Sequence, residues 1–113
     1  MKTNQFDSEN NKTGLWVTYW DNGNIYSQGQ YSKNEKTGQW LYYFENGKVL
    51  SKGSYENGKK TGQWEYCYDN GLMWCKGEFK ENKEIGIWQY WWANGSYRES
   101  VNHGGVLAAK NKC

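Results

Sequence analysis

The chain has 113 residues and a formal net charge of +2, so charge alone is too weak to drive nucleic-acid binding. Aromatic residues make up 19 % of it, with 8 Trp, 10 Tyr and 3 Phe, and so much buriable ring surface argues against a disordered chain. No apolar run reaches the roughly 18 residues of a membrane span, and the single histidine, His103, excludes a multi-histidine metal site.

The polar N-terminal residues and the cysteines predict the cellular compartment of the protein. The first residues lack the apolar segment of a signal peptide. Cys67, Cys75 and Cys113 show no CxxC spacing and are odd in number, which fits a reducing compartment. We therefore expect a cytoplasmic protein with Cys113 as a free thiol in its tail.

A unit of 24 residues repeats along most of the chain. Its markers are a glycine, a tryptophan and an Asn-Gly pair. The glycine recurs as Gly14, Gly38, Gly62 and Gly86, and the tryptophan as Trp16, Trp40, Trp64 and Trp88. The Asn-Gly pair begins at Asn22, Asn46, Asn70 and Asn94. The single repeat domain, 1–113, divides into a half-repeat at 6–13, repeats at 14–37, 38–61, 62–85 and 86–103, and a tail at 104–113. We expect the tail to form a short helix or a capping strand.

Each unit predicts a β-hairpin. Residues 39–44 and 49–55 are β-prone, and Asn46-Gly47 between them suits the two positive φ values of a type I′ turn. A polar segment at 56–61 then predicts a connecting loop. The fold class is therefore all-β, an antiparallel meander of four to five consecutive hairpins in one elongated, twisted sheet.

The turn also predicts which residues face each other. A two-residue turn at Asn46-Gly47 pairs Trp40 with Gly53, and the same rule pairs the tryptophans of the flanking units with Gly29 and Gly77. We expect each indole to lie across the bare backbone of its paired glycine. Trp88 instead faces Val101, so the fourth unit is expected to be distorted or to act as a cap.

Two groups of candidate residues follow from this register. The first is structural, because a fold rule produces identity in every repeat: Trp16, Trp40, Trp64, Trp88, Gly29, Gly53 and Gly77. The second varies between repeats and is expected to lie on the opposite face as a partner- or ligand-binding patch: Tyr43, Leu50, Lys52, Trp74, Lys76, Trp91 and Arg98. A weak second core or a homodimer contact is the alternative for this patch.

Two further residue types have a structural explanation. Cys67 and Cys75 fall on opposite faces in this register, so we expect no shared disulfide or metal between them. His103 stands where other repeats have an aromatic ring, and we interpret it as a replaced ring rather than a catalytic base. We expect no catalytic residue, no metal and no cofactor.

The segments 38–47, 53–55 and 58–62 read GQWLYYFENG, GSY and GKKTG. They resemble the MORN repeat (membrane occupation and recognition nexus), in the bacterial form found in YwqK-like antitoxin proteins. Residues 14–35, 38–61 and 62–85 match the pattern well, whereas 86–103 match in their first half only, because Val101 and His103 replace Gly and Tyr. The resemblance implies a non-enzymatic scaffold that binds proteins or, in some members, phospholipids.

Three functions remain open. The first is a binding module that occludes a protein partner such as a toxin or effector, as an antitoxin, immunity protein or scaffold does. The second is sequestration of a small aromatic or nucleotide ligand, as in a phage anti-defence protein, since rings stack on bases and Lys52, Lys76 or Arg98 can hold phosphates. The third is peripheral phospholipid binding, which the absence of a basic cluster disfavours. No duplex nucleic acid is expected, and a homodimer is left open.

Overall fold

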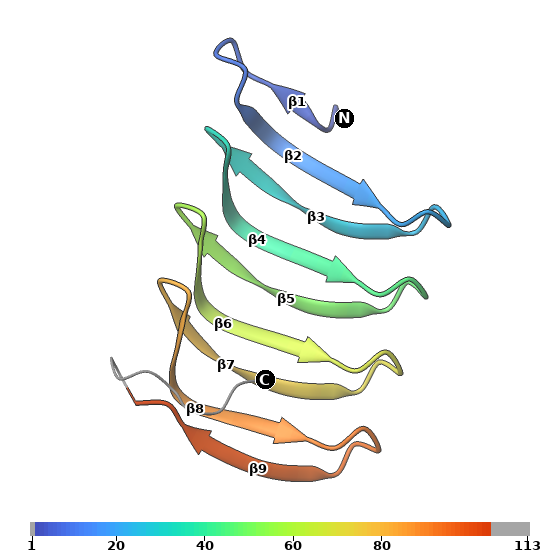
Figure 1. The fold of residues 1–113 in the computed structure, drawn as a ribbon, viewed down its shortest axis with the longest axis vertical. Coiled ribbons are helices and arrows are strands. Elements are labelled where there is room, and N and C mark those ends of the chain that lie inside the picture. The colour runs from blue at the N-terminus through green and yellow to red at the C-terminus, as the bar shows by residue number, and fades with distance from the viewer. Residues whose placement is uncertain (1, 105–113) are drawn as a thin grey trace.

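The computed structural model describes residues 2–104, and all regular structure in this part of the chain is β. The strands are β1 (Gln5–Phe6), β2 (Lys12–Tyr19), β3 (Ile25–Ser32), β4 (Glu35–Tyr43), β5 (Val49–Glu56), β6 (Lys59–Cys67), β7 (Met73–Lys80), β8 (Lys83–Trp91) and β9 (Tyr97–Asn102). They form one antiparallel sheet in sequence order (Figure 1). The predicted β-meander is therefore confirmed, whereas the expectations for the tail and Cys113 lie outside the described residues.

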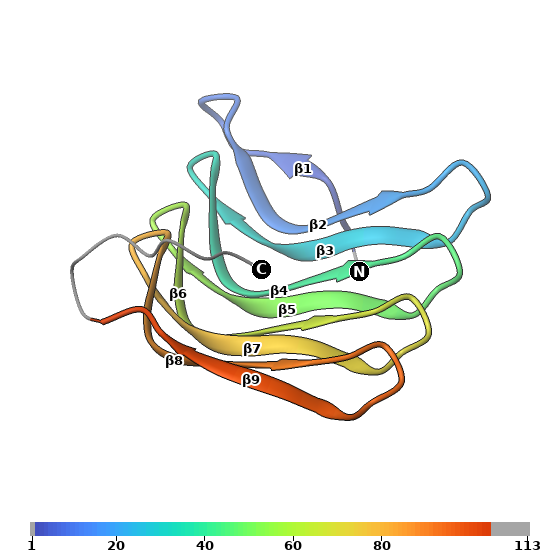
Figure 2. The ribbon, with the colours of Figure 1, turned by 60° about the horizontal axis from the view of Figure 1, so that its bottom comes forward.

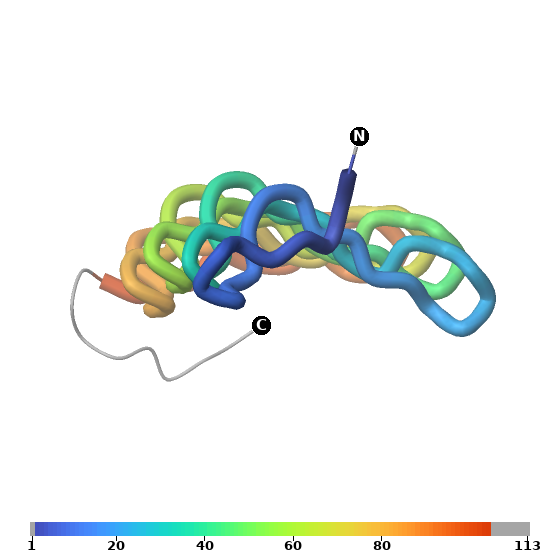
Figure 3. Tube along the Cα trace, turned by 90° about the horizontal axis from the view of Figure 1, so that it is seen from above, coloured from blue at the N-terminus to red at the C-terminus, as the bar shows by residue number. Residues whose placement is uncertain are grey.

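The sheet is a single layer, with extents of 47 × 35 × 18 Å. Seen from above, its two rows of turns lie at opposite ends of the profile (Figure 3). The strands β2, β4, β6 and β8 bend sharply near their beginnings (Figure 2). The repeat glycine in the first half of these strands, for example Gly38 of β4 or Gly62 of β6, has a φ of +69° or +71°. A Cβ there would meet no atom within 4 Å, so the left-handed backbone, and not space, requires glycine.

A second set of glycines is required by space. Trp40 pairs with Gly53 across its hairpin, as predicted. Its indole, however, lies on Gly29 of the preceding hairpin, where an added Cβ would be 2.1 Å from the ring. The indole Nε1 donates to the carbonyl oxygen of Gln30 at 3.0 Å, beside that glycine. The prediction that each ring covers its own paired glycine is therefore wrong, because the ring leans across the junction between hairpins.

The turns also differ from the prediction. At the Asn-Gly turn, Gly47 N–H donates to the Phe44 carbonyl and Phe44 N–H donates to the Lys48 carbonyl, at 2.9 and 2.8 Å. Gly47 has a φ of +91°, whereas Asn46 has no positive φ. This is a type I turn with a glycine bulge, which needs one left-handed residue instead of the two of type I′.

The two-residue turns lie at the other end of the sheet. Lys33 and Asn34, Asn57 and Gly58, and Glu81 and Asn82 all have positive φ and join strands that pair directly on either side. The predicted loop at 56–61 is therefore wrong, since β5 ends at Glu56 and β6 begins at Lys59. Both connections of the repeat are tight turns, which makes the sheet continuous.

The fourth hairpin has the same geometry as the others. Trp88 pairs with Val101, and the irregularity near the turn recurs between Tyr90 and Trp91. The expected distortion is therefore absent. Valine is tolerated at 101 because, among the described residues, no following hairpin places an indole there, as Trp88 does at Gly77.

Asparagine side chains tie each hairpin to the next. Their Nδ2 groups donate to a main-chain carbonyl oxygen 23 residues later, at 2.8–3.0 Å, in Asn22 to Glu45, Asn46 to Asp69 and Asn70 to Ala93. The same side chains accept the N–H two residues on, at 2.8–2.9 Å. The asparagine of the Asn-Gly pair thus stabilises both its own turn and the hairpin stack.

We predict that Gly53→Ala costs about 3 kcal/mol of unfolding free energy, because the new Cβ overlaps the Trp64 ring. In a Trp64→Leu background the same change should cost under about 1 kcal/mol, since the ring is gone. Urea unfolding of the single and double variants measures this coupling. Gly38→Ala is the control: it should cost roughly 1–2 kcal/mol in both backgrounds, because its strain is in the backbone. Equal costs for Gly53→Ala in both backgrounds would contradict the overlap.

We predict that Asn46→Ala lowers stability by about 1 kcal/mol more than Asn94→Ala. Both side chains accept the N–H two residues on, but only Asn46 donates to the next hairpin. Because Asn94 Oδ1 also accepts the Ser96 hydroxyl at 2.6 Å, both substitutions are made in a Ser96→Ala background. The difference then isolates the bond between hairpins, and urea denaturation of the two variants measures it. Equal losses would show that the asparagine matters only within its turn.

Candidate binding surfaces

Aromatic rings form a continuous ladder along the sheet. Neighbouring rings meet edge to face with centroids 5.1–6.1 Å apart, in the order Phe6, Trp16, Tyr31, Trp40, Tyr55, Trp64, Phe79, Trp88 and His103. Such contacts add roughly 0.5–1.5 kcal/mol each beyond burial. Trp40, Trp64 and Trp88 are at most 2 % exposed. His103 takes the last ring position, where the sequence predicts a replaced aromatic.

Three lysines lie against this ladder, and sequence reasoning missed them. Lys12, Lys36 and Lys60 place Nζ 4.9–5.5 Å from ring centroids of their own hairpins. Lys36 Nζ also donates to the Tyr42 hydroxyl at 2.7 Å, and Lys60 Nζ to that of Tyr66 at 2.8 Å. Their 24-residue spacing is the signal that identifies them. They act as cation–π partners of the ladder and not as solvated loop charges.

The fourth unit replaces this lysine with an acid. Glu84 stands 24 residues after Lys60, and its Oε1 lies 3.7 Å from Nδ1 of His103. The side chains are 9 % and 0 % exposed, and the Tyr90 hydroxyl lies 3.5 Å from the other ring nitrogen of His103. Burial, and then the nearby Glu84 carboxylate, raise the pKa of Tyr90. The ladder therefore ends in a buried carboxylate–imidazole pair.

A strand irregularity near the Asn-Gly turn divides the predicted patch between two faces. The register shifts after Tyr42, so Tyr43 pairs with Val49 and not with Leu50. In the third hairpin the Trp74 ring consequently lies 6.1 Å from Tyr66, on the side of the tryptophan column. The prediction that all seven patch residues share the opposite face is therefore wrong, because the extra residue reverses which side chains point to each side.

Three patch residues lie on the face that carries the ladder, which we call the ladder face. Trp74 packs against the buried cluster of Trp64 and its neighbours. Arg98 Cζ lies 5.6 Å from the Tyr90 ring and 5.0 Å from the Trp92 ring. Leu50 occupies the corresponding position of the second hairpin, and Tyr26 that of the first, 6.4 Å from Tyr42. This row of four variable side chains runs beside the tyrosines of the ladder face.

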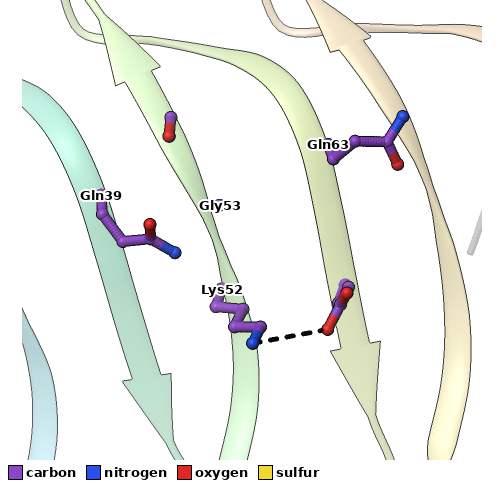
Figure 4. A pocket seen from close by; sticks show the side chains of 6 residues that line it. Gln39, Lys52, Gly53 and Gln63 are labelled. Atoms are coloured by element: carbon purple, nitrogen blue, oxygen red, sulfur yellow. Dashed lines mark ion pairs between the residues drawn. The ribbon is translucent and has the colours of Figure 1, made fainter.

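The other four patch residues lie on the opposite side, which we call the polar face. Tyr43 accepts a hydrogen bond from Gln28 Nε2 at 2.7 Å, and Lys76 Nζ lies 5.8 Å from the Trp91 ring. Lys52 Nζ is 3.8 Å from Glu65 Oε1, and both side chains are partly exposed. The pair lines a shallow depression of about 300 Å³ with Gln39, Gly53, Ser54 and Gln63 (Figure 4). The depression is mixed in charge and polar.

Residues 2–104 form no site for a metal ion or for a reactive thiol. No group of three or more His, Cys, Asp or Glu side chains there could hold a metal ion. Cys67 is a free thiol and Cys75 is fully buried, so the two do not bridge each other. Burial raises the pKa of the Cys67 thiol, which disfavours the reactive thiolate. No helix of the described chain is long and apolar enough to span a membrane.

The repeat can now be compared with known proteins. Residues 12–33 and 36–59 match the family model of the MORN repeat variant. These two segments are therefore similar to the MORN repeat. A search of curated proteins gave no match. MORN repeats are typically binding modules and are not known as catalytic units. The hairpins of this chain provide a single-layer sheet with one aromatic and one polar face.

We predict that the sheet loses stability as pH rises from about 10 to about 12. Burial raises the pKa of Tyr66 to about 12, and the Glu84 carboxylate acts in the same direction. An unfolded tyrosine ionises near pH 10, so above that pH the unfolded chain binds fewer protons than the folded one and stability falls. Urea midpoints at pH 9, 10, 11 and 12 measure the loss. Tyr66→Phe should flatten the curve, and an identical slope in that variant would exclude Tyr66 as a cause.

Proposed function

We propose that this protein is a non-enzymatic binding module that recognises and occludes a protein partner through its ladder face. The observation that carries the proposal is an aromatic sheet face that no second layer covers within residues 2–104. Tyr26 is 43 % exposed and Trp92 53 %. Uncovered apolar surface of this kind commonly marks an interaction site.

The variable row on the ladder face suits protein recognition. Its members are Tyr26, Leu50, Trp74 and Arg98, and Tyr, Trp and Arg are the residue types most often found as binding hot spots. They stand on paired strands supported by the buried ladder below, so their side chains lose little conformational freedom on binding. We propose that this row sets specificity, because the shared repeat residues already hold the fold.

Occlusion is the mode of action that fits a small rigid sheet. The chain would cover a functional surface of a toxin or effector, as an antitoxin or immunity protein of the YwqK-like type does. Shielding requires a broad contact face and no catalytic group. The 47 × 35 Å face is larger than the roughly 800 Å² per partner of a standard interface.

Nucleotide and lipid binding receive less support. Two of the three cations considered for phosphate binding already lie beside carboxylates, Lys52 by Glu65 and Arg98 by Glu99, at 3.8 and 3.0 Å. Lys76 instead lies beside the Trp91 ring. The net charge of +2 gives weak attraction to acidic membranes. A protein partner therefore remains the best-supported proposal.

We predict that Trp74→Leu weakens partner binding at least about tenfold. Leucine stands at the same position in the second hairpin, as Leu50, so the variant should keep the fold. The partner is first identified by affinity capture from the source cell and mass spectrometry. Titration calorimetry with the purified partner then compares the wild type, Trp74→Leu and the control Lys59→Ala, an exposed residue at the start of β6, with melting temperatures measured in parallel.

Unchanged affinity in Trp74→Leu would remove the ladder face from the proposal. Stabilisation of the protein by millimolar cyclic or adenine nucleotides in a thermal-shift assay would favour ligand sequestration instead. Co-sedimentation with acidic liposomes would favour the lipid alternative. The three assays therefore distinguish the three proposed functions.

A further inference from the structure

The last hairpin ends in side-chain donors of the kind that earlier hairpins use to hold their successors. Trp20 Nε1 donates to the Tyr43 carbonyl oxygen at 3.0 Å, and the Tyr68 hydroxyl donates to that of Trp91 at 2.7 Å. The asparagine Nδ2 bonds described above run in the same direction, from one hairpin to the next. Each hairpin of this chain is thus held to the preceding one, because its main-chain carbonyl oxygens accept hydrogen bonds from side chains of that preceding hairpin.

Trp92 and Asn94 are the corresponding donors of the last hairpin. Within residues 2–104 neither Trp92 Nε1 nor Asn94 Nδ2 donates a hydrogen bond, although Asn94 Oδ1 accepts its turn N–H at 2.9 Å. Beside them β9 pairs with β8 on one side only. Five of its six residues are exposed, and Trp92 and Tyr97 flank it at 53 % and 52 % exposure.

The opposite end of the sheet is closed. The side chain of Asn4 donates to the Val17 carbonyl and accepts the Val17 N–H, at 2.9 and 2.7 Å. These two bonds take the place of the main-chain bonds that a neighbouring strand would make with β2. Strand β1 pairs with the start of β2, and Phe6 covers Trp16. A second copy therefore cannot add its β9 along this edge. The asymmetry leaves β9 as the open edge of the described sheet.

Val101 restricts what can follow β9. Each preceding hairpin has glycine at this position, and the indole of the next hairpin lies on it, as Trp88 lies on Gly77. A Cβ at Gly77 would be 2.1 Å from that ring. The side chain at Val101 therefore excludes a further tryptophan-bearing hairpin in the same register. The edge also lacks Pro, which blocks strand addition, and its two charged residues, Arg98 and Glu99, pair with each other at 3.0 Å.

We propose that β9 is the docking edge for an extended segment of the protein partner, which adds antiparallel as the next strand. The segment presents main-chain carbonyl oxygens to Trp92 Nε1 and Asn94 Nδ2, and carries a small side chain where it passes Val101. Main-chain pairing gives such a contact its affinity, and the exposed Tyr97, Arg98 and Trp92 give it specificity. This inference rests on the proposed protein-binding function and extends its contact from the ladder face to the adjoining edge.

The test uses the intact protein and a synthetic ten-residue peptide of alternating Thr and Ala with a lysine at each end. Hydrogen–deuterium exchange measured by mass spectrometry follows residues 97–102. At nine-tenths occupancy we expect exchange there to slow about tenfold. A twin peptide N-methylated at alternate amides should give no slowing, because it cannot pair along a strand.

Variants link the protection to the named donors. Trp92→Ala and Asn94→Ala should each raise the peptide Kd about threefold to tenfold, the range expected for one hydrogen bond. Tyr19→Ala is the matched control: it removes a 61 % exposed ring from the first hairpin and should leave the Kd unchanged. Far-UV circular dichroism of each variant checks that the sheet is retained.

Three results would overturn the proposal: no slowing at residues 97–102 with millimolar peptide, equal slowing by the methylated twin, or a dimer in which a second copy already protects β9. If the captured partner still binds while β9 exchanges freely, the ladder-face function stands and the edge proposal alone fails. If β9 pairs with the peptide but Trp74→Leu leaves partner affinity unchanged, the edge proposal stands without the ladder face.

Discussion

The contact between an indole and a bare glycine of the preceding hairpin is the interaction on which this fold depends. A single-layer sheet has no second layer to bury its side chains, so each hairpin must bury them against the next one. A Cβ added at Gly53 would lie only 2.1 Å from the Trp64 ring, which shows how closely this ring approaches the Gly53 main chain. The ring closes the junction between hairpins, and its N–H satisfies a carbonyl at the same strand irregularity. Repetition then extends the sheet one hairpin at a time.

Much of this could be predicted from the sequence. The 24-residue spacing indicates the repeat, β-propensity and Asn-Gly indicate hairpins, and the pairing of Trp40 with Gly53 follows from the turn. The ring's position could not be predicted, because pairing within one hairpin does not say toward which neighbouring strand a side chain leans. The type of turn could not be predicted either, since Asn-Gly suits both a type I′ turn and a type I turn with a glycine bulge.

The candidate site was harder to predict than the fold, for one physical reason. The side-chain period of a strand is two, so one extra residue reverses every side chain beyond it. The irregularity after Tyr42 therefore moves Leu50, Trp74 and Arg98 to the ladder face while Tyr43 and Trp91 remain on the polar face. Residue choice within the patch followed from variability between repeats and did not depend on this facing. The lysines of the ladder were missed because a charge near a turn normally indicates solvent exposure.

Repeats that are nearly identical make their departures informative. Glu84 replaces the repeat lysine and His103 the repeat Tyr or Phe, and they end the ladder with a buried carboxylate–imidazole pair. Val101 replaces a glycine at the one position where no described hairpin follows. Asn94 and Trp92 keep the residue type that joins hairpins although no described hairpin accepts their bonds. In a quasi-one-dimensional sheet each unit contacts only its neighbours, so a terminal unit can change without disturbing the rest. The C-terminal hairpin can therefore close the aromatic core and still leave a strand edge open.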